Sequence, residues 1–392
     1  MSAALRSRRV LFVSNGHGED WIAAAIVRAL PPGLEIDAYP MVGTGGAYAD
    51  ICPIVGPRAQ VASEGWRNVK GSWRRDIMGG ALATVPPALS FLRAVRDHYQ
   101  TVVVVGDMVG ILAALSTGHR DLLYIDVYKT GAARLYSPLE RRAIKRTCRT
   151  VFCRAESLAS PLRRLGIDAR AAGNVMMDTI PTLAYDAAGR RRKRLGLTLL
   201  PGSRALTVES FAVQVEALRT VPDEERPDVF LAVAGGVDVA ALAEATGLSQ
   251  SIWPTAEPGD LGALQDRDLT IHMARGAALG QLISASDLVM SQAGTATVQA
   301  LGSGRPAITF MNPRDRRSRF RDEQGLFGDA RLVTTPDASS VGKALRTLLN
   351  DDADRQRRAA IGRERIGGPG ALQEIVAVLC ETAGQIPPAV EA

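Results

Sequence analysis

Short runs of β-branched and aliphatic residues recur along the chain, each followed by glycine and then by a longer amphipathic stretch. The clearest run is residues 102–105, four consecutive valines that end at Gly106 and Asp107. Strands buried on both faces have this continuous apolar character, and the amphipathic stretches between them supply crossover helices. The pattern therefore predicts an α/β fold with parallel sheets that carry helices on both faces.

A polar, arginine-rich stretch that includes GRRRKRLG interrupts this alternation near the middle of the 392-residue chain. A chain of this length is too long for a single hydrophobic core. We therefore expect two doubly wound, Rossmann-like domains that face a central cleft. The expected parts are an N-terminal acceptor-binding domain (1–174), a linker (175–196), a C-terminal nucleotide-sugar-binding domain (197–366) and a terminal helical segment (367–392). Packing of that segment against the N-terminal domain is one option.

The strands expected in the two halves are given by their residue numbers. Those of the first half are 9–14, 34–40, 102–105, 122–126, 150–153 and 169–172. Those of the second half are 197–200, 229–234, 269–272, 288–291, 307–310 and 332–334. A helix is expected to follow the first strand at 20–30, and one at 371–382 is expected to end the fold.

Composition excludes several classes of protein. The formal net charge is +6 and most of the positive charge is arginine, which fits a nucleotide or an anionic lipid surface. No zinc-finger spacing, aromatic platform or basic heptad helix indicates nucleic-acid binding. The four histidines and four cysteines show no metal-ligand spacing, and no apolar run reaches 18 residues. We expect a cytoplasmic protein without a bound metal.

The first glycine-rich loop reads SNGHGEDW over residues 14–21. Gly16 and Gly18 allow backbone N–H groups to face an anion or a bound sugar. The loop is not GxGxxG, and no acidic residue ends the next strand, which argues against a dinucleotide dehydrogenase. His17 and Glu19 are catalytic candidates. The alternatives are a loop-stabilising hydrogen bond for the histidine and first-turn helix positions for Glu19 and Asp20.

Asp107 ends the valine strand of the first domain. A carboxylate at the carboxyl end of a central parallel strand lies where such sheets bind their ligands. Asp107 could deprotonate an acceptor hydroxyl, or orient a histidine that does so. The alternative is that it caps the following helix.

The segment LLPGSR at 199–204 is the strongest single motif of the second domain. Proline and glycine force a sharp turn out of a strand. The backbone at Gly202, the Ser203 hydroxyl and the Arg204 guanidinium can then converge on a diphosphate. A plain β-turn would explain proline, glycine and serine, but not the whole hexamer.

The segment SQAGTAT at 291–297 is a second junction of strand, glycine and helix. Gly294 and Ala296 let the backbone approach a ligand, and a helix that begins at Thr295 and continues through Thr297 offers its N–H groups to phosphate. Gln299, one turn into that helix, could reach ribose hydroxyls or be an ordinary surface glutamine.

Two arginine-rich segments lie outside the glycine-containing motifs described above. The segment WRNVKGSWRR at 66–75 combines two tryptophans with basic residues, and residues 77–92 after it are largely apolar. A peripheral membrane contact through 66–92 would use this mixture, whereas a core helix after a solvated loop is the alternative. The second patch, RDRRSRFR at 314–321, could bind phosphates or lipid head groups, or be a solvated face.

Together these segments resemble the lipid-A-disaccharide synthase-related family of GT-B glycosyltransferases. The matching pieces occur in the family's order: the first loop at 10–30, GTGG…GPR…EGW at 43–66, VGD at 105–107, GN-V-MMD at 173–178, LLPGSR at 199–204 and the segment at 286–310. The first loop also resembles the GGH loop of the peptidoglycan GlcNAc transferase. Gln299 stands where the family more often has glutamate.

The resemblance implies an enzyme of the GT-B fold that needs no metal or other cofactor. It would transfer a hexose or GlcNAc-type sugar, with inversion, from a UDP-sugar to a hydroxyl of a lipid or membrane-associated acceptor at the inner face of the membrane. Two alternatives stay open. A UDP-GlcNAc 2-epimerase shares the fold and acts on the nucleotide sugar itself, and a non-catalytic relative would only bind the nucleotide.

Overall fold

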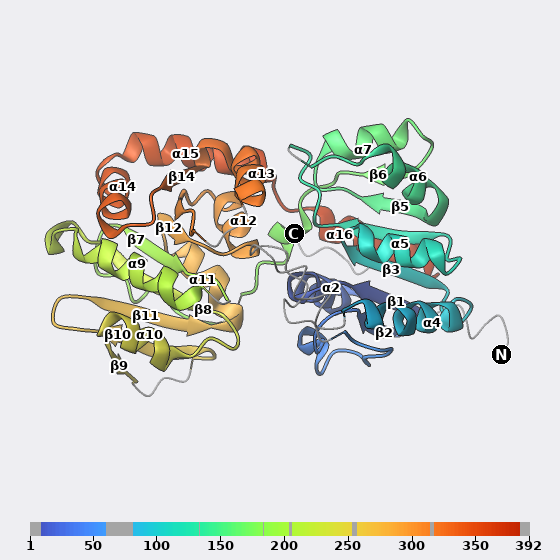
Figure 1. The fold of residues 1–392 in the computed structure, drawn as a ribbon, viewed down its shortest axis with the longest axis horizontal. Coiled ribbons are helices and arrows are strands. Elements are labelled where there is room, and N and C mark those ends of the chain that lie inside the picture. Colours follow the sequence, from blue (N-terminus) through green and yellow to red (C-terminus); the bar gives the residue numbers. More distant parts are fainter. Residues whose placement is uncertain are drawn as a thin grey trace. The chain divides into compact units, whose positions relative to one another are not determined.

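The computed structural model describes residues 9–59, 81–132, 134–182, 184–203, 206–252, 257–313 and 317–384. These residues form two compact units (Figure 1). Unit 1 contains the chain up to Thr179 and the segment from Pro369 onward, whereas unit 2 runs from Ile180 to Gly368. Each unit is built around its own β-sheet.

The sheet of unit 1 is parallel throughout, in the order β2-β1-β3-β4-β5-β6. Its strands are β1 (Arg9–Ser14), β2 (Glu35–Pro40), β3 (Thr101–Gly106), β4 (Leu122–Asp126), β5 (Cys148–Phe152) and β6 (Asp168–Arg170). Every residue of β3 is buried, as its valine run predicts. The chain adds β2 on one side of β1 and the later strands on the other. The switch point of the sheet therefore lies between β1 and β3.

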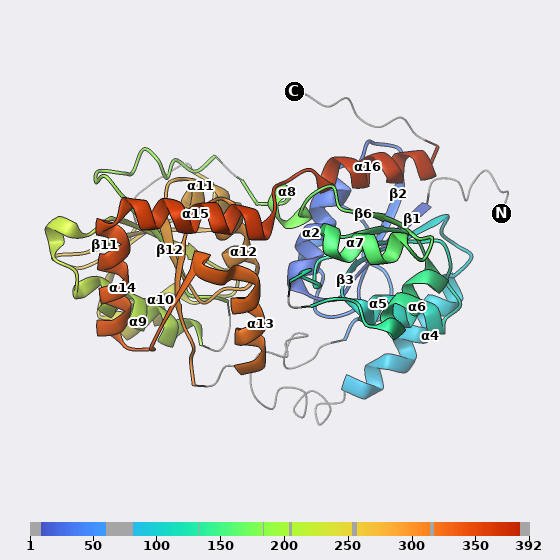
Figure 2. The ribbon, with the colours of Figure 1, turned by 90° about the horizontal axis from the view of Figure 1, so that it is seen from above.

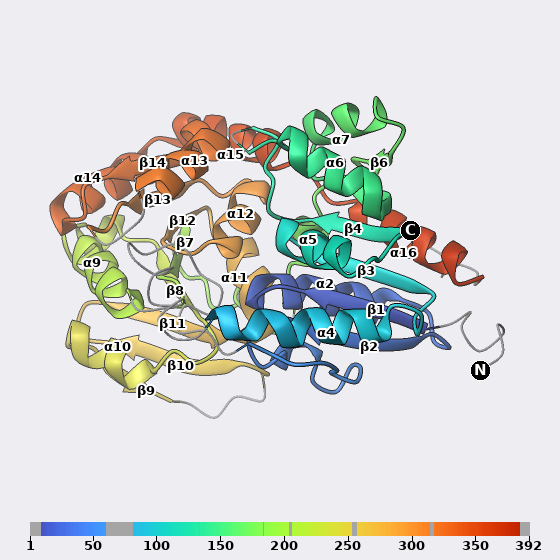
Figure 3. The same ribbon diagram turned by 45° about the vertical axis from the view of Figure 1, so that its right-hand side comes forward.

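Helices cover the sheet of unit 1. They are α2 (His17–Ala29), α4 (Val85–Val95), α5 (Met108–Ser116), α6 (Pro138–Thr147), α7 (Glu156–Arg163), α8 (Val175–Asp178) and α16 (Ala371–Thr382), with 3₁₀ turns η1 (Gly46–Tyr48) and η2 (Ala81–Thr84). The helices α4 and α5 lie side by side (Figure 3), and α16 packs on α2 and α8 (Figure 2). The sequence pattern placed the start of α2 at Asp20, which is wrong. The amide of Asp20 already donates to the carbonyl of Gly16, at 2.8 Å, so the helix begins at His17.

One carboxylate of unit 1 caps the start of the C-terminal helix α16. The backbone amides of Gly370, Ala371 and Leu372 donate to the two oxygens of Asp178 at 2.7, 3.1 and 3.3 Å. These amides open a helix and have no partner within it, so an aspartate that lies 192 residues before Gly370 provides the cap. The contact links the segment after Pro369 to α8, which lies inside the stretch predicted as a linker.

Unit 2 contains an eight-stranded sheet in the order β14-β13-β12-β7-β8-β11-β10-β9. Its strands are β7 (Gly196–Leu200), β8 (Asp228–Val233), β9 (Ser249–Ser251), β10 (Asp260–Gln265), β11 (Thr270–Arg275), β12 (Leu288–Ser291), β13 (Ala307–Phe310) and β14 (Arg331–Thr334). The strands pair in parallel except at β9 and β10, which are antiparallel additions at one edge. The direction of strand addition reverses between β7 and β12, which makes this pair the switch point of unit 2.

The helices of unit 2 are α9 (Thr207–Arg219), α10 (Val239–Thr246), α11 (Leu279–Ser284), α12 (Thr295–Gly302), α13 (Arg317–Phe327), α14 (Ala338–Asn350) and α15 (Asp352–Ile366), with 3₁₀ turns η3 (Asp223–Glu225), η4 (Gly276–Ala278) and η5 (Gly328–Ala330). The helices α9 and α14 pack on each other over the sheet. Phe211, Leu199 and Leu345 belong to one buried cluster, which gives unit 2 a hydrophobic core of its own.

The predicted α/β class with two doubly wound sheets is confirmed. The strands predicted from apolar runs are present, most of them within two residues of the expected bounds. The edge strands β9 and β10 were not predicted. The strand β9 has only three residues, and polar residues and a glycine interrupt the apolar pattern of β10, so an edge hairpin has little signal in the sequence.

Candidate functional site

Two loops of unit 1 meet at the switch point of its sheet. Parallel strands end at the same edge, so the loop after β1 and the turn after β3 are neighbours. The side-chain amide of Asn15 donates to Oδ1 of Asp107 at 3.2 Å. The backbone amide of Val109 donates to the same oxygen at 2.9 Å, so Asp107 also caps α5. The structure thus brings Asp107 against the first loop, and the capping alternative considered from the sequence is also present.

Glu19 covers the glycines at this edge. A Cβ atom added to Gly106 would lie 3.2 Å from Cγ of Glu19, and one added to Gly16 would lie 2.8 Å from its Oε2. Both glycines have a positive φ, +139° and +152°, which side chains rarely adopt. The loop therefore needs glycine at both positions for Glu19 to pack here. Gly18 lies in the first turn of α2.

The structure describes the backbone of His17 as the first residue of α2, while its side chain lies outside the described part. The catalytic roles of His17, Glu19 and Asp107 therefore stay predictions. Because α2 starts at His17, all three residues lie at the carboxyl edge of the sheet or in the first helical turn that follows it.

The most buried carboxyl group of the first loop is Asp20, which is only 1% exposed. The hydroxyl of Ser14 donates to its Oδ1 at 2.6 Å. Burial raises the pKa of Asp20 to about 7, the hydrogen bond from Ser14 opposes this shift, and the neighbouring charge of Glu19 adds to it. The sequence shows Asp20 in one cluster with His17 and Glu19, but Asp20 is not among the catalytic candidates chosen from it, and a first-turn helix position is the alternative for it. The available signal was helical spacing, since Asp20, Ala23, Ala24 and Val27 share the buried face of α2.

In unit 2 the two glycine-containing loops lie side by side. Leu200 and Ser291 are register partners on the neighbouring strands β7 and β12. The amide of Gln292 donates to the carbonyl of Leu200 at 2.8 Å. A Cβ atom added to Gly202, whose φ is +105°, would lie 3.6 Å from the carbonyl oxygen of Gln292. The turn at residues 201–203 and the AGTAT junction, about ninety residues apart in sequence, therefore lie side by side at the switch point of this sheet.

The helix α12 begins at this site without a side-chain cap. Its N-cap residue is Gly294, so the amides of Thr295 and Ala296 face the loop with no capping hydroxyl or carboxylate. Unpaired amides at a helix N-terminus attract phosphate. Ser203 is exposed beside this turn, whereas Arg204 lies outside the described residues.

The other polar side chains of α12 turn inward. The hydroxyl of Thr297 donates to the carbonyl of Ala293 at 2.5 Å and shares a hydrogen bond with the Ser291 hydroxyl at 2.6 Å. Thr297 is 2% exposed, and Gln299 is 4% exposed. The Thr297 side chain therefore fixes the helix to the end of β12, and the predicted ribose contact of Gln299 stays a prediction.

One further group at this edge was not singled out from the sequence. The hydroxyl of Thr309 donates to Oε1 of Gln292 at 3.4 Å. The Nε2 atom of Gln292 is buried, and no described residue accepts a hydrogen bond from it. Gln292, whose backbone carbonyl lies beside Gly202, thus carries an unsatisfied side-chain donor at the end of β12.

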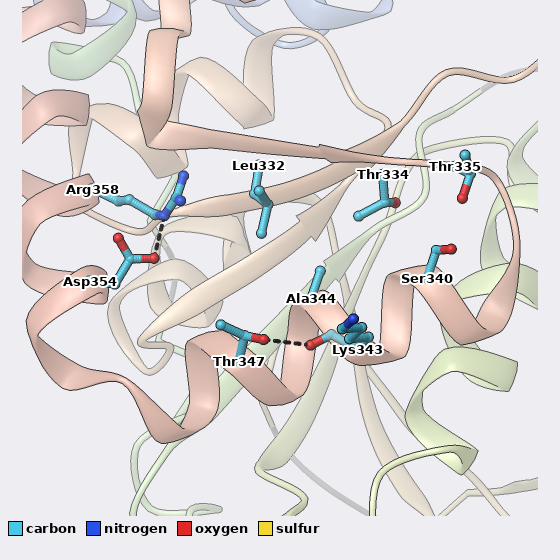
Figure 4. A pocket seen from close by; sticks show the side chains of 9 residues that line it. All are labelled: Leu332, Thr334, Thr335, Ser340, Lys343, Ala344, Thr347, Asp354 and Arg358. Atoms are coloured by element: carbon cyan, nitrogen blue, oxygen red, sulfur yellow. Dashed lines mark hydrogen bonds and ion pairs between the residues drawn. The ribbon is translucent and has the colours of Figure 1, made fainter.

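Unit 2 has an open hollow of about 420 Å³ away from these loops (Figure 4). It is lined by residues of β14, α14 and α15: Leu332, Thr334, Thr335, Ser340, Lys343, Ala344, Thr347, Asp354 and Arg358. The Arg358 guanidinium is held by Asp354 at 2.7 Å, so one of the two basic groups is already neutralised. No part of the PGSR or AGTAT loops reaches it, and we assign it no function.

The predicted membrane contact over 66–92 lies partly outside the described residues, which resume at 81. The described end forms α4, where Leu92 is buried and Val85 is exposed. Of the helices that the structure describes, none is both long and apolar enough to cross a membrane. Within the same ranges, no cluster of three or more histidine, cysteine, aspartate or glutamate residues could hold a metal ion.

The two doubly wound units define the chain as a member of the GT-B class of folds, which glycosyltransferases and sugar-nucleotide epimerases share. The S. aureus MnaA–UDP co-structure superposes with a TM-score of 0.60 at 13% identity, over 97% of this chain and 98% of MnaA. The glycosyltransferase SnogD from Streptomyces nogalater gives 0.55 at 20% identity, over 96% and 99%. A putative UDP-N-acetylglucosamine 2-epimerase from Listeria monocytogenes gives 0.58 at 17% identity, over 98% and 100%.

No protein-family model and no curated protein matches this chain. At identities of 20% or less, the structural similarities establish the fold alone. The narrower resemblance to lipid-A-disaccharide synthases therefore stays a prediction from the motifs.

Proposed function

We propose that this chain is an inverting, metal-independent glycosyltransferase that moves a hexose or GlcNAc-type sugar from a UDP-sugar to a hydroxyl of a lipid or membrane-associated acceptor. The observation that supports the proposal is that the turn after β7 and the AGTAT junction lie side by side at the switch point of unit 2. The fold is that of MnaA, which was solved with UDP, and of the glycosyltransferase SnogD.

In this proposal unit 2 binds the donor. Diphosphate oxygens accept hydrogen bonds from the amides of Thr295 and Ala296 at the uncapped start of α12. Gly202 lets the backbone approach the same oxygens because it has no side chain. The Ser203 hydroxyl and the Arg204 guanidinium complete the set, and together these groups stabilise the negative charge that develops on UDP as it leaves.

Unit 1 supplies the base. The acceptor oxygen forms a bond to C1 of the sugar while the bond from C1 to the UDP oxygen breaks, and its electron pair leaves with UDP. The acceptor proton passes to His17 or Asp107. Attack on the face opposite UDP inverts the configuration at C1. Asp107 is suited to this role because the Asn15 amide and the Val109 amide hold its Oδ1 and leave Oδ2 for the acceptor.

The first experiment measures UDP binding by titration calorimetry and then UDP release from UDP-GlcNAc, UDP-glucose and UDP-galactose in the presence of bacterial lipid extract. We expect binding with a Kd in the micromolar range and release that requires the extract. A chain that neither binds UDP nor releases it from any of these donors would contradict the proposal.

Variants separate the two halves of the site. Ser203→Ala and Arg204→Ala should weaken UDP binding at least tenfold, because each removes a diphosphate contact. His17→Ala and Asp107→Asn should leave UDP binding intact and lower turnover on the order of a hundredfold or more. Asparagine also caps helices, so Asp107→Asn keeps the start of α5 in place. Full turnover in both unit 1 variants would contradict the assignment of the base.

An epimerase is the second candidate, and the similarity to the Listeria UDP-N-acetylglucosamine 2-epimerase favours it. An epimerase needs no acceptor, so the two functions differ in a simple mixture. UDP-GlcNAc is incubated with the protein alone and followed by proton NMR. New sugar signals without UDP release would indicate epimerisation. Unchanged signals together with UDP binding would exclude the epimerase, and UDP release in the presence of lipid extract would then distinguish a transferase from a non-catalytic relative.

A further inference from the structure

Three buried polar groups form a chain beneath the loops of unit 1. Asp20 lies on α2, Ser14 ends β1 and Tyr48 ends η1 in the segment after β2. The Ser14 Oγ atom lies 2.6 Å from Oδ1 of Asp20 and 2.7 Å from the Tyr48 hydroxyl. The exposed fractions are 1% for Asp20, 1% for Ser14 and 0% for Tyr48, so water does not compete for these hydrogen bonds.

The chain has a direction. Asp20 accepts from Ser14, so the Ser14 hydroxyl proton is used and its oxygen is left to accept from the Tyr48 hydroxyl. The second carboxyl oxygen, Oδ2 of Asp20, is buried, and no described residue donates to it. An asparagine would provide the same acceptor for Ser14 without the cost of a buried carboxyl group, so stability alone does not explain an aspartate here.

The titratable groups around Asp20 are few. Glu19 on its own helix and Tyr48 on η1 interact with it electrostatically, and Cys52 lies next to Tyr48. The helix α16 also packs on α2, and its Glu374 is paired with Arg170 at 3.2 Å. Among these neighbours no cation pairs with the Asp20 carboxylate.

Tyr48 connects this chain to the glycine-rich loop after β2. Its amide donates to the carbonyl of Gly45 at 2.9 Å, and the amide of Gly43 donates to the carbonyl of Ala59 at 2.9 Å. Gly45 has a positive φ of +73°, and three of the residues 43–46 are glycines, which carry no side chain. The Tyr48 hydroxyl is a side-chain link between this loop and Ser14, which precedes the loop after β1.

We propose that Asp20 is a positioning residue of the unit 1 site, which acts through Ser14 and Tyr48 to hold the glycine-rich loop 42–48 against the loop after β1. The ionised carboxylate holds the chain more tightly than the neutral acid, because a charged acceptor forms the stronger hydrogen bond. The inference deepens the proposed function, since loop 42–48 and the first loop would together shape the acceptor side of the site.

The direct test is amide hydrogen exchange of the full-length protein, read at Gly43 and Tyr48. Ser14→Ala and Tyr48→Phe each remove one hydroxyl from the chain and keep the packing. We expect both to speed exchange in the loop at least fivefold, with no change in the strands of unit 2. Asp50→Asn is the matched control, because Asp50 is exposed, lies two residues after Tyr48 and has a φ of 60° that asparagine tolerates. Unchanged exchange in both hydroxyl variants would overturn the proposal.

A second readout rests on the proposed function and uses the pH profile of turnover. The ratio kcat/KM for the acceptor should rise with pH through about 7 in the wild type, where Asp20 ionises. Asp20→Asn should remove the part of this rise that comes from Asp20 and leave only the dependence given by the base, with a raised KM for the acceptor and UDP affinity unchanged. A wild-type profile that Asp20→Asn leaves unaltered would overturn the positioning role. If UDP neither binds nor is released, the proposed function fails, and the exchange measurement still decides the role of Asp20.

Discussion

Asp20 and Asp107 are carboxyl groups at the same edge of one sheet, and their surroundings give them different properties. Asp107 is partly exposed and accepts hydrogen bonds from Val109 and Asn15. Asp20 is buried and has a single donor, Ser14. Removal from water disfavours the charged form, which is why the pKa of Asp20 rises to about 7. The two aspartates, similar in the sequence, thus differ in burial and in their hydrogen-bond donors, and burial brings the ionisation of Asp20 close to neutral pH.

The raised pKa of Asp20 predicts how stability depends on pH. Because the folded-state pKa of about 7 exceeds the ordinary aspartate value of 3.8, the stabilising contribution of the Asp20 carboxyl group is fully present below about pH 4 and is lost as pH rises through about 7. Each pKa unit corresponds to about 1.4 kcal/mol. Asp20→Asn, which cannot ionise, should therefore gain a few kcal/mol relative to the wild type between pH 5 and pH 8. Urea unfolding of the variant and the wild type at pH 5 and at pH 8 measures this gain. An equal difference in unfolding free energy at the two pH values would show that Asp20 does not titrate between them.

Gly202 provides a residue-scale prediction for the donor site. Gly202→Ala places a methyl group at a φ of +105° and beside the backbone of Gln292. The strain costs on the order of 1–2 kcal/mol, and the methyl group also obstructs the approach of a diphosphate. UDP affinity measured by calorimetry should fall at least tenfold. Gly247→Ala is the control, since Gly247 ends α10 with a φ of +67° and open space around it. Comparable losses of affinity in both variants would point to a general folding defect.

At the scale of elements, the N-termini of α12 and α16 differ in whether a side chain accepts hydrogen bonds from their backbone amides. The start of α12 has no side-chain cap and is therefore available to an anion. The amides at the start of α16 have acceptors within the protein, because Asp178 accepts hydrogen bonds from three of them. Helix N-terminal amides without a partner inside the helix are thus a candidate anion site in α12 and a point of attachment to Asp178 in α16.

Removing the Asp178 cap at the start of α16 should lower the stability of the protein. Asp178→Ala leaves three amides of the helix without acceptors and should cost about 1–3 kcal/mol in the free energy of unfolding. Asp337→Ala is the matched comparison, because Asp337 caps α14 through the single amide of Ser340. Thermal unfolding should show the larger decrease for Asp178→Ala. A smaller decrease than that of Asp337→Ala would mean that the attachment of α16 depends on its apolar face.

At the scale of the whole molecule, the two units differ in how the chain builds them. Unit 2 is one continuous segment, Ile180–Gly368, with its own hydrophobic core. Unit 1 is discontinuous, since the chain returns to it at Pro369 and α16 contributes buried residues such as Ile375 and Leu379. The continuous unit contains both loops of the proposed donor site.

A fragment of residues 180–368 should therefore fold alone and bind UDP within about threefold of the full-length affinity, because each group proposed to contact the diphosphate belongs to it. Circular dichroism and calorimetry on the fragment check both points. A folded fragment that binds UDP more than tenfold more weakly would show that unit 1 contributes to donor binding. A fragment of residues 1–179 lacks α16 and should be less stable than unit 1 in the full-length protein.

The sequence by itself determined the α/β class, most parallel strands and the two glycine-rich junctions of unit 2. Runs such as residues 102–105 are local signals that depend only on burial of a strand on both faces. The motifs PGSR and AGTAT were visible for the same reason, since a turn of proline and glycine or a glycine before a helix is encoded within a few residues.

The tertiary structure alone decided which distant groups meet. Only the pairing of β7 with β12 brings Gly202 next to Gln292, and only the packing of α2 on the sheet buries Asp20 beside Ser14 and Tyr48. The caps given by Asp178 also span residues far apart in sequence. Helical spacing could place Asp20 on the buried face of α2, but its hydrogen bond to Ser14 and its link to loop 42–48 depend on the whole fold and had no local signature in the sequence.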